Sequence, residues 1–254
     1  MRLKLIPPFK SMDLPPGVLS TPDRLLADIE SEGLLKGVEW DLDEGVPGPS
    51  VKNREELAQV IPGVLKVVRQ ACESGRYDAL AILGGLDPGL YAAREIGAAY
   101  GIPVVGTTHS AVLFAYGLGH RFAVIDVLEG LAIVVRQMLM SYGMNDKCAS
   151  VRSMECQVQD IRASTGTELV EKFVRECIDA IEKDGADVIV CGCTATLLLR
   201  PQAQKRLAEL GYEVPVLDGY RCAIEFAKAQ VGMRISQSRL AYPDSVVKKR
   251  SIPR

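Results

Sequence analysis

The chain of 254 residues contains one stretch of sequence twice, and this repeat restricts its fold more than any other feature. The first copy, residues 78–115, begins DALAILGG, and the second, residues 187–227, begins DVIVCGCT. Each copy runs from an Asp through an apolar strand into a helix and returns on a second strand, IPVVG or VPVLD. Superposition sets Asp78 on Asp187 and Gly84 on Cys193. We therefore predict two related α/β units, in which a thiol at one strand end is matched by a glycine.

The patterns along the chain predict parallel sheets. Apolar runs such as ALAIL and DVIVC lack polar alternation, which is typical of strands covered on both faces. Strand and helix patterns alternate, as in βαβ units. The predicted fold class is α/β, with two pseudo-symmetric doubly wound parallel-sheet halves and an active-site cleft between them. We expect residues 1–117 plus about 219–254 to form the first half and residues 118–218 to form the second.

Several local signals place the helices. Thr21, followed by Pro22, predicts the start of one helix, and Asn53 predicts the start of another that ends near Ser74. Pro62 is expected to disturb that second helix. The small residues of CGCT predict a turn from the strand directly into a helix.

Composition excludes several classes of function. The 30 basic and 32 acidic residues are spread along the chain, so we expect no nucleic-acid partner. No apolar stretch approaches the roughly 20 residues that span a bilayer, and the N-terminus is no secretory signal. We expect a cytoplasmic protein without membrane contact. Most of the seven cysteines are then expected to be free thiols, and the absence of paired CxxC or clustered His residues predicts no metal site.

The candidate site follows from the expected sheets, because open parallel sheets bind ligands beyond the carboxyl ends of their strands. Cys193 is the sharpest candidate for catalysis, since N–H groups at a helix start favour a thiolate. His109 and Asp87 also follow strand ends and are candidate acid/base groups. Structural roles remain open for both, a helix start for His109 and a helix cap for Asp87. Asp126 follows a strand end too, and capping is the favoured role for it. The candidate substrate-binding residues are Pro8, Gly84, Gly85, Thr107, Thr108, Thr194 and Tyr220.

These motifs together resemble the aspartate/glutamate racemase superfamily, and within it the hydantoin and allantoin racemase-like branch. The matching segments are DPGLYAARE, PVVG before TTHSA, LGHRFAVI, DVIVCGCT, VPVLDG and SQSRLAYP. The resemblance implies an enzyme without cofactor or metal, in which two cysteines face each other across the cleft. The second of these is Cys193, whereas the first would fall at Gly84 and is missing. Pro8 and Phe9 likewise replace the Asn and Thr that often follow the first strand.

Three functions remain open on these grounds. The first is a cofactor-independent racemase or epimerase of a small hydantoin-like or amino-acid-like substrate, with a second base other than cysteine. The second is a lyase or decarboxylase that protonates an enediolate through Cys193 alone. It is similar in this respect to arylmalonate decarboxylase, which also has glycine at the first position. The third is a non-catalytic small-molecule-binding protein. The expected partner is a carboxylate or a cyclic imide or hydantoin, and the tail is compatible with packing on a neighbour in a homo-oligomer.

Overall fold

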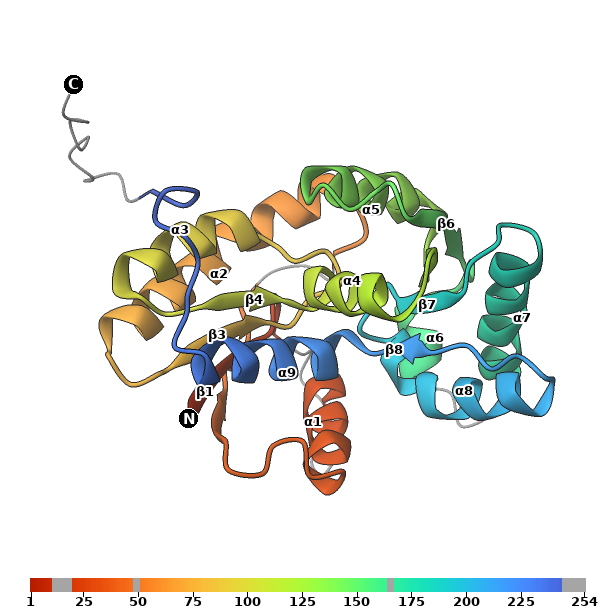
Figure 1. Cartoon of the computed structure of the whole chain (residues 1–254), viewed down its shortest axis with the longest axis horizontal. Coiled ribbons are helices and arrows are strands. Elements are labelled where there is room, and N and C mark those ends of the chain that lie inside the picture. The colour runs from red at the N-terminus through yellow and green to blue at the C-terminus, as the bar shows by residue number, and fades with distance from the viewer. Residues whose placement is uncertain (11–19, 48–50, 164–166, 244–254) are drawn as a thin grey trace.

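The chain forms two sheets, each made of parallel strands, and the sheets lie side by side (Figure 1). The computed structural model describes residues 1–10, 20–47, 51–163 and 167–243. Within these residues each sheet has four strands, in the order β2-β1-β3-β4 and β6-β5-β7-β8. The first sheet contains β1 (Arg2–Ile6), β2 (Glu39–Leu42), β3 (Ala79–Ile82) and β4 (Val104–Gly106). The second contains β5 (Phe122–Asp126), β6 (Cys148–Ser153), β7 (Val188–Cys191) and β8 (Val216–Leu217). The predicted fold class is therefore confirmed.

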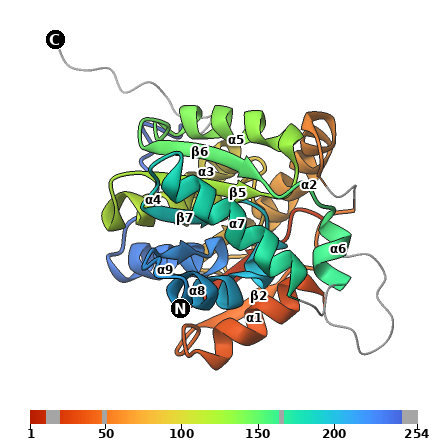
Figure 2. The same ribbon diagram turned by 90° about the vertical axis from the view of Figure 1, so that its right-hand side faces the viewer.

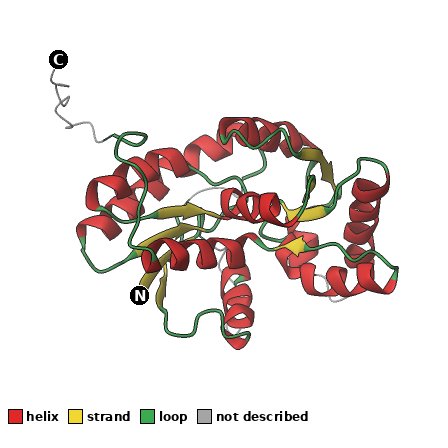
Figure 3. Cartoon of the chain, viewed as in Figure 1, coloured by secondary structure: helices red, strands yellow, loops and turns green. Residues whose placement is uncertain are grey.

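Helices alternate with the strands along the chain (Figure 3). Those of the first half are α1 (Thr21–Ser31), α2 (Arg54–Glu73), α3 (Leu90–Tyr100) and α4 (Thr107–Leu118). The others are α5 (Glu129–Ser141), α6 (Val158–Ala163), α7 (Glu168–Glu182), α8 (Arg200–Glu209) and α9 (Gly219–Gly232), together with a 3₁₀ turn, η1 (Thr196–Leu198). No helix in the described part of the chain is both long and apolar enough to cross a bilayer.

The repeated aspartates have a structural reason. The Asp78 carboxylate accepts the backbone N–H of Arg2 at 2.7 Å, while the Asp78 N–H donates to the Arg2 carbonyl at 2.8 Å. Asp187 makes the same two bonds with Arg121, at 2.9 and 2.8 Å. Each Asp thus fixes the register between the two central strands of its sheet. The two halves share this register, which accounts for the repeat in the sequence.

Both faces of each sheet are covered, as the uninterrupted apolar strands predict. In the first sheet, Leu80 and Ile82 pack with residues of α2 and α3. Leu3 and Leu5 on the opposite face pack with residues of α1 and α9. In the second sheet one face packs with α4 and α5, and the other with α7 and α8. Figure 2 shows α7 crossing in front of this sheet.

Two helices pack across the halves. α4 follows β4 in the chain but contacts β5 and β7 of the second sheet, and α9 follows β8 but contacts β3 and β4 of the first. α4 and α9 also pack against each other. The expected boundary after residue 117 therefore lies at the end of a helix that already rests on the second sheet. Residues 244–254 of the expected first half lie outside the described residues.

The cap of α1 and the effect of Pro62 differ from the expectations, whereas the cap of α2 agrees with them. Ser20 rather than Thr21 caps α1, and its side chain accepts the N–H of Asp23 at 3.2 Å. Asn53 caps α2 as expected, accepting the N–H of Glu56 at 2.9 Å. α2 continues through Pro62, which lies on its exposed face, because the opposite face is buried against the sheet.

The two halves meet where the turn after β3 touches the turn after β7. A Cβ on Gly85 would lie only 2.1 Å from the carbonyl oxygen of Gly192. We expect Gly85→Ala to lower the free energy of unfolding by roughly 1–3 kcal/mol, because the two backbones must separate. Gly117→Ala is the control, since a Cβ there meets nothing within 4 Å. Urea titrations of both variants check this, and equal stabilities would contradict it.

Candidate active site

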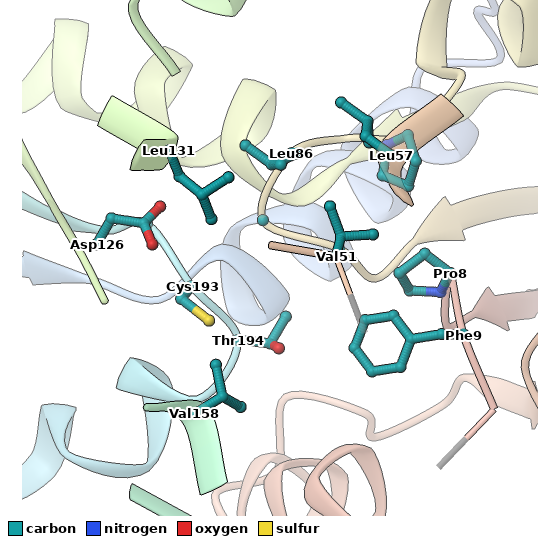
Figure 4. A pocket seen from close by; sticks show the side chains of 14 residues that line it. Pro8, Phe9, Val51, Leu57, Leu86, Asp126, Leu131, Val158, Cys193 and Thr194 are labelled. Carbon is teal, nitrogen blue, oxygen red and sulfur yellow. The ribbon is translucent and has the colours of Figure 1, made fainter. Parts of the chain in front are cut away.

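The carboxyl ends of the strands border one cleft between the halves (Figure 4). The space between its walls, with the open solvent at its mouth included, is roughly 530 Å³. In Figure 4 Cys193 and Asp126 stand on one side, and Pro8 and Phe9 stand on the other. The lining residues are Pro8, Phe9, Val51, Leu57, Gly84, Gly85, Leu86, Pro88, Asp126, Leu131, Val158, Gly192, Cys193 and Thr194.

Cys193 follows β7 and is partly exposed in the cleft. The segment after it differs from the expectation. Instead of a helix that begins directly, the 3₁₀ turn η1 begins at Thr196, and α8 begins only at Arg200. The Thr196 hydroxyl donates to the Cys193 carbonyl at 2.7 Å and fixes this turn. A long helix with a full dipole therefore does not start at the thiol, so the expected activation of Cys193 by a helix start is not supported.

The internal symmetry of the structure makes Gly84 the counterpart of Cys193. The N–H of Leu83 donates to the carbonyl of Ile6 at 2.8 Å, and the N–H of Gly192 donates to that of Ile125 at 2.8 Å. Gly84 and Cys193 are the residues that come next. The thiol of Cys193, after β7, thus corresponds to Gly84, after β3, which has no side chain.

Pro8 fills the space that a side chain at position 84 would need. A Cβ on Gly84 would lie 2.8 Å from Cγ of Pro8 and 3.1 Å from Cδ of Pro88. Both distances are shorter than ordinary contacts between carbon atoms. The wall opposite Cys193 is therefore apolar and closed, as Pro8, Gly84 and Leu86 show.

The two candidate threonines of α4 bind the backbone of the Gly84–Gly85 turn. The Thr107 hydroxyl donates to the Gly84 carbonyl at 2.7 Å, and the Thr108 hydroxyl donates to the Gly85 carbonyl at 2.6 Å. Neither side chain lines the cleft. Both threonines therefore support the shape of the turn, and of the candidate threonines it is Thr194 that lines the cleft.

Asp87 and His109 also lie outside the cleft lining. Asp87 accepts the backbone N–H groups of Thr108 at 3.1 Å and His109 at 2.7 Å, and so caps α4. Its φ of 44° is left-handed, which is uncommon for a residue with a side chain. The Tyr142 hydroxyl also donates to it at 2.9 Å. Burial raises the pKa of Asp87 to about 6, although these donors oppose the shift.

The His109 ring packs between Arg94, Tyr142 and Phe226, away from the cleft. Burial, together with the neighbouring Arg94 guanidinium, lowers the pKa of His109 to about 3. At neutral pH the ring is therefore uncharged. The Arg94 guanidinium also donates to the Tyr242 hydroxyl at 3.2 Å, which connects this cluster to the C-terminal segment. The contacts of Asp87 and His109 are those of structural groups.

Tyr220 and Arg221, at the start of α9, have structural partners. The buried Tyr220 hydroxyl donates to the Leu83 carbonyl at 3.3 Å. Arg221 pairs with Asp218 and with Glu32, to which its Nε donates at 2.8 Å. Neither residue lines the cleft. The ion pairs of Arg221 with Glu32 and Asp218 thus occupy its guanidinium group away from the cleft lining.

Asp126 lines the cleft beside Cys193, and capping was the favoured role for it. Its place directly after an apolar strand was a signal for a site residue. The carboxyl group is 1% exposed. Burial raises the pKa of Asp126 to about 6. The backbone N–H groups of Val127 and Leu128 favour the ionised form and oppose this shift.

The apolar side chains of the cleft were not anticipated. Val51, Leu57, Leu131 and Val158 come from loops and helices that have no motif of their own. No signal in the sequence placed them here. Among the described residues, no group of three or more His, Cys, Asp or Glu side chains is arranged to hold a metal ion.

Comparison with known proteins identifies the family. Residues 36–227 match the Asp/Glu/Hydantoin racemase family. A hydantoin racemase of Rhizobium meliloti is 31% identical over 198 residues, which cover 76% of this chain and 78% of that protein. The chain is thus an α/β enzyme of the isomerase class, and it belongs to the Asp/Glu/Hydantoin racemase family.

Solved structures agree with this assignment. Allantoin racemase from Klebsiella pneumoniae is 25% identical, with a TM-score of 0.80 over 98% of this chain and 96% of that one. Arylmalonate decarboxylase shares the fold at 17% identity, with a TM-score of 0.59 over 91% of this chain and 93% of that one.

The cysteines differ in their expected reactivity. Burial raises the pKa of Cys72 and Cys148 to about 11, raises that of Cys222 to about 12, and raises those of Cys156, Cys177 and Cys191 as well. Because the thiolate is the nucleophile, iodoacetamide at pH 7.5 should label Cys193 first. Peptide mapping by mass spectrometry checks this, and the denatured chain, which labels at all seven positions, is the control. Earlier labelling of the partly exposed Cys148 or Cys156 would contradict the prediction.

Asp126 should make stability depend on pH. Its pKa in the folded protein, about 6, lies above the ordinary 3.8, so its contribution is fully present below about pH 4 and is lost as the pH rises through 6. The loss amounts to at most about 3 kcal/mol. Asp126→Asn removes this pH dependence. The free energy of unfolding of the variant minus that of the wild type should therefore be larger at pH 7.5 than at pH 4. Urea titrations at both pH values check this, and a difference independent of pH would refute it.

Proposed function

We propose that this enzyme moves a proton at an acidic carbon of a small substrate, hydantoin-like or amino-acid-like, with Cys193 as the acid/base group and without a cofactor. The observation that supports this is the position of Cys193 in the cleft, opposite a wall without a proton-transferring side chain among the described residues. The thiolate takes the proton from the carbon, and the C–H electron pair moves onto the neighbouring carbonyl group. The thiol then returns a proton to the carbon.

A site with one thiol implies a particular stereochemistry. Return of the proton by Cys193 occurs on the face from which it left and retains the configuration. Inversion requires protonation from the other face, where Gly84 and Pro8 supply no donor and water must act. Exchange of the substrate proton with solvent is therefore faster than inversion in such a site.

A lyase or decarboxylase that protonates its product from one face is the second candidate. The apolar wall of Pro8, Phe9 and Leu86 favours it, because a neutral leaving group such as carbon dioxide needs no polar partner there. Its substrate would carry a carboxylate, and its product would contain one solvent-derived hydrogen with a single configuration.

An incubation in D₂O distinguishes these candidates. The substrate is an enantiopure hydantoin with an apolar substituent at its acidic carbon. We expect deuterium to enter faster than the optical rotation decays, measured by NMR and chiral chromatography. Cys193→Ala should slow both processes by about 10²–10⁴-fold, the size of an acid/base contribution. Cys156→Ser, at a cysteine outside the cleft lining, is the control. Unchanged turnover in Cys193→Ala would refute the proposal, and release of carbon dioxide from an arylmalonate would favour the lyase.

Restoring the missing thiol should change the ratio of inversion to exchange. Gly84→Cys alone forces its Cβ against Pro8, so we expect a less stable protein with little gain in inversion. Gly84→Cys combined with Pro8→Ala relieves this contact and places a thiol on each face. Inversion should then approach the rate of exchange in the same D₂O assay. Pro8→Ala alone is the control. Equal inversion by the single and the double variant would show that Pro8 does not obstruct position 84.

A further inference from the structure

Among the described residues that line the cleft, those with a polar side chain or a thiol, Asp126, Cys193 and Thr194, all belong to the second half. The matching bonds of Leu83 to Ile6 and of Gly192 to Ile125 make Pro7 the counterpart of Asp126, just as Gly84 is the counterpart of Cys193. The second half therefore supplies a carboxyl group and a thiol from two adjacent strand ends. The first half supplies proline and glycine at the same two places.

The Asp126 carboxyl group is buried next to the thiol turn, at the border of the cleft. Its Oδ1 accepts the N–H of Val127 at 2.6 Å. Its Oδ2 lies beside Gly192, and a Cβ on that glycine would stand 2.9 Å from this oxygen. Because Gly192 has no side chain, nothing from this residue separates the carboxyl group from the cleft that Cys193 lines. Figure 4 shows both side chains on the same side of the cleft.

No cation balances this carboxyl group among the described residues that line the cleft, since none of them is Lys, Arg or His. Arg221, which follows the end of β8, is paired with Glu32 and Asp218. A substrate carboxylate placed here would meet a like charge in a poorly solvated site, which is unfavourable. An N–H group of a neutral substrate would instead give the carboxylate a hydrogen bond to a charged acceptor, one of the stronger kinds.

We propose that Asp126 determines the substrate class of this site. Its carboxylate accepts an N–H of a neutral cyclic amide or ureide, next to the carbon at which Cys193 transfers the proton. It excludes substrates that carry a carboxylate at that place. The proposal rests on the proposed function for the position of the reacting carbon. The apolar wall of Pro8, Phe9 and Leu57 then receives the substituent of the ring. Asp126 is a binding group in this role, and the proton transfer remains with Cys193.

Binding measured without turnover tests this role. Isothermal titration of Cys193→Ala compares two probes with the same apolar group, 5-benzylhydantoin and benzylmalonate. We expect the hydantoin to bind at least about 10-fold more tightly. Adding Asp126→Asn should weaken hydantoin binding by about 10-fold or more, as expected for the loss of a charged acceptor, and should reduce or reverse the preference. Asn retains the size of the side chain and one acceptor oxygen for Val127.

Glu129→Gln on the same background is the control. It removes one negative charge from the first turn of α5 at an exposed position outside the lining, so both affinities should remain as in Cys193→Ala. An unchanged preference in Asp126→Asn, a parent that prefers benzylmalonate, or a parent that binds neither probe would each overturn the proposal. Failure of the proposed function appears elsewhere, as normal turnover in Cys193→Ala, so the two failures can be told apart.

Discussion

The contact between two backbone turns determines the rest of this structure. The turn after β3 and the turn after β7 approach so closely that Gly85 leaves no room for a side chain beside the Gly192 carbonyl. Two sheets that meet at their carboxyl ends in this way form one shared cleft, because the ends of the central strands β1, β3, β5 and β7 then border the same space. The threonines of α4 hold the first turn through its carbonyl groups, and α4 itself packs on the second sheet. The same elements that join the halves therefore also shape the site.

The symmetry of the backbone contrasts with the asymmetry of the side chains. The matching hydrogen bonds at the strand ends have the same length in both halves, 2.8 Å. Pro7 and Gly84 nevertheless stand where the other half has Asp126 and Cys193. Pro8 closes the space at Gly84, so the loss of a side chain there is accompanied by a wall that fills the gap. In the proposed function, such a site transfers protons at one face of its substrate. The two halves of this chain thus share a backbone arrangement while the side chains that they place at the cleft differ.

The sequence predicted the sheets and part of the site for a physical reason. Apolar runs and the repeated Asp78 and Asp187 determine strand order and register, so the residues at the strand ends, such as Cys193 and Gly84, follow directly. The direction in which a side chain points after a strand end depends on where the next helix begins. The sequence patterns do not determine that direction. His109 and Asp87 therefore turned out to support α4. The apolar wall depends on packing between distant segments, and no local pattern marks its members.

Asp87 and Asp126 show why burial alone does not identify a functional carboxyl group. Both are nearly inaccessible, and burial raises the pKa of each to about 6. Asp87 receives two N–H groups from the start of α4 and the Tyr142 hydroxyl, so its neighbours compensate for the desolvation and it organises a helix. Among the described residues, Asp126 receives the N–H groups of the two residues that follow it, and it borders the cleft. A buried charge is expensive unless a partner satisfies it. Because none of the described residues that line the cleft is a cation, the N–H group of the proposed substrate is the partner that would complete this site.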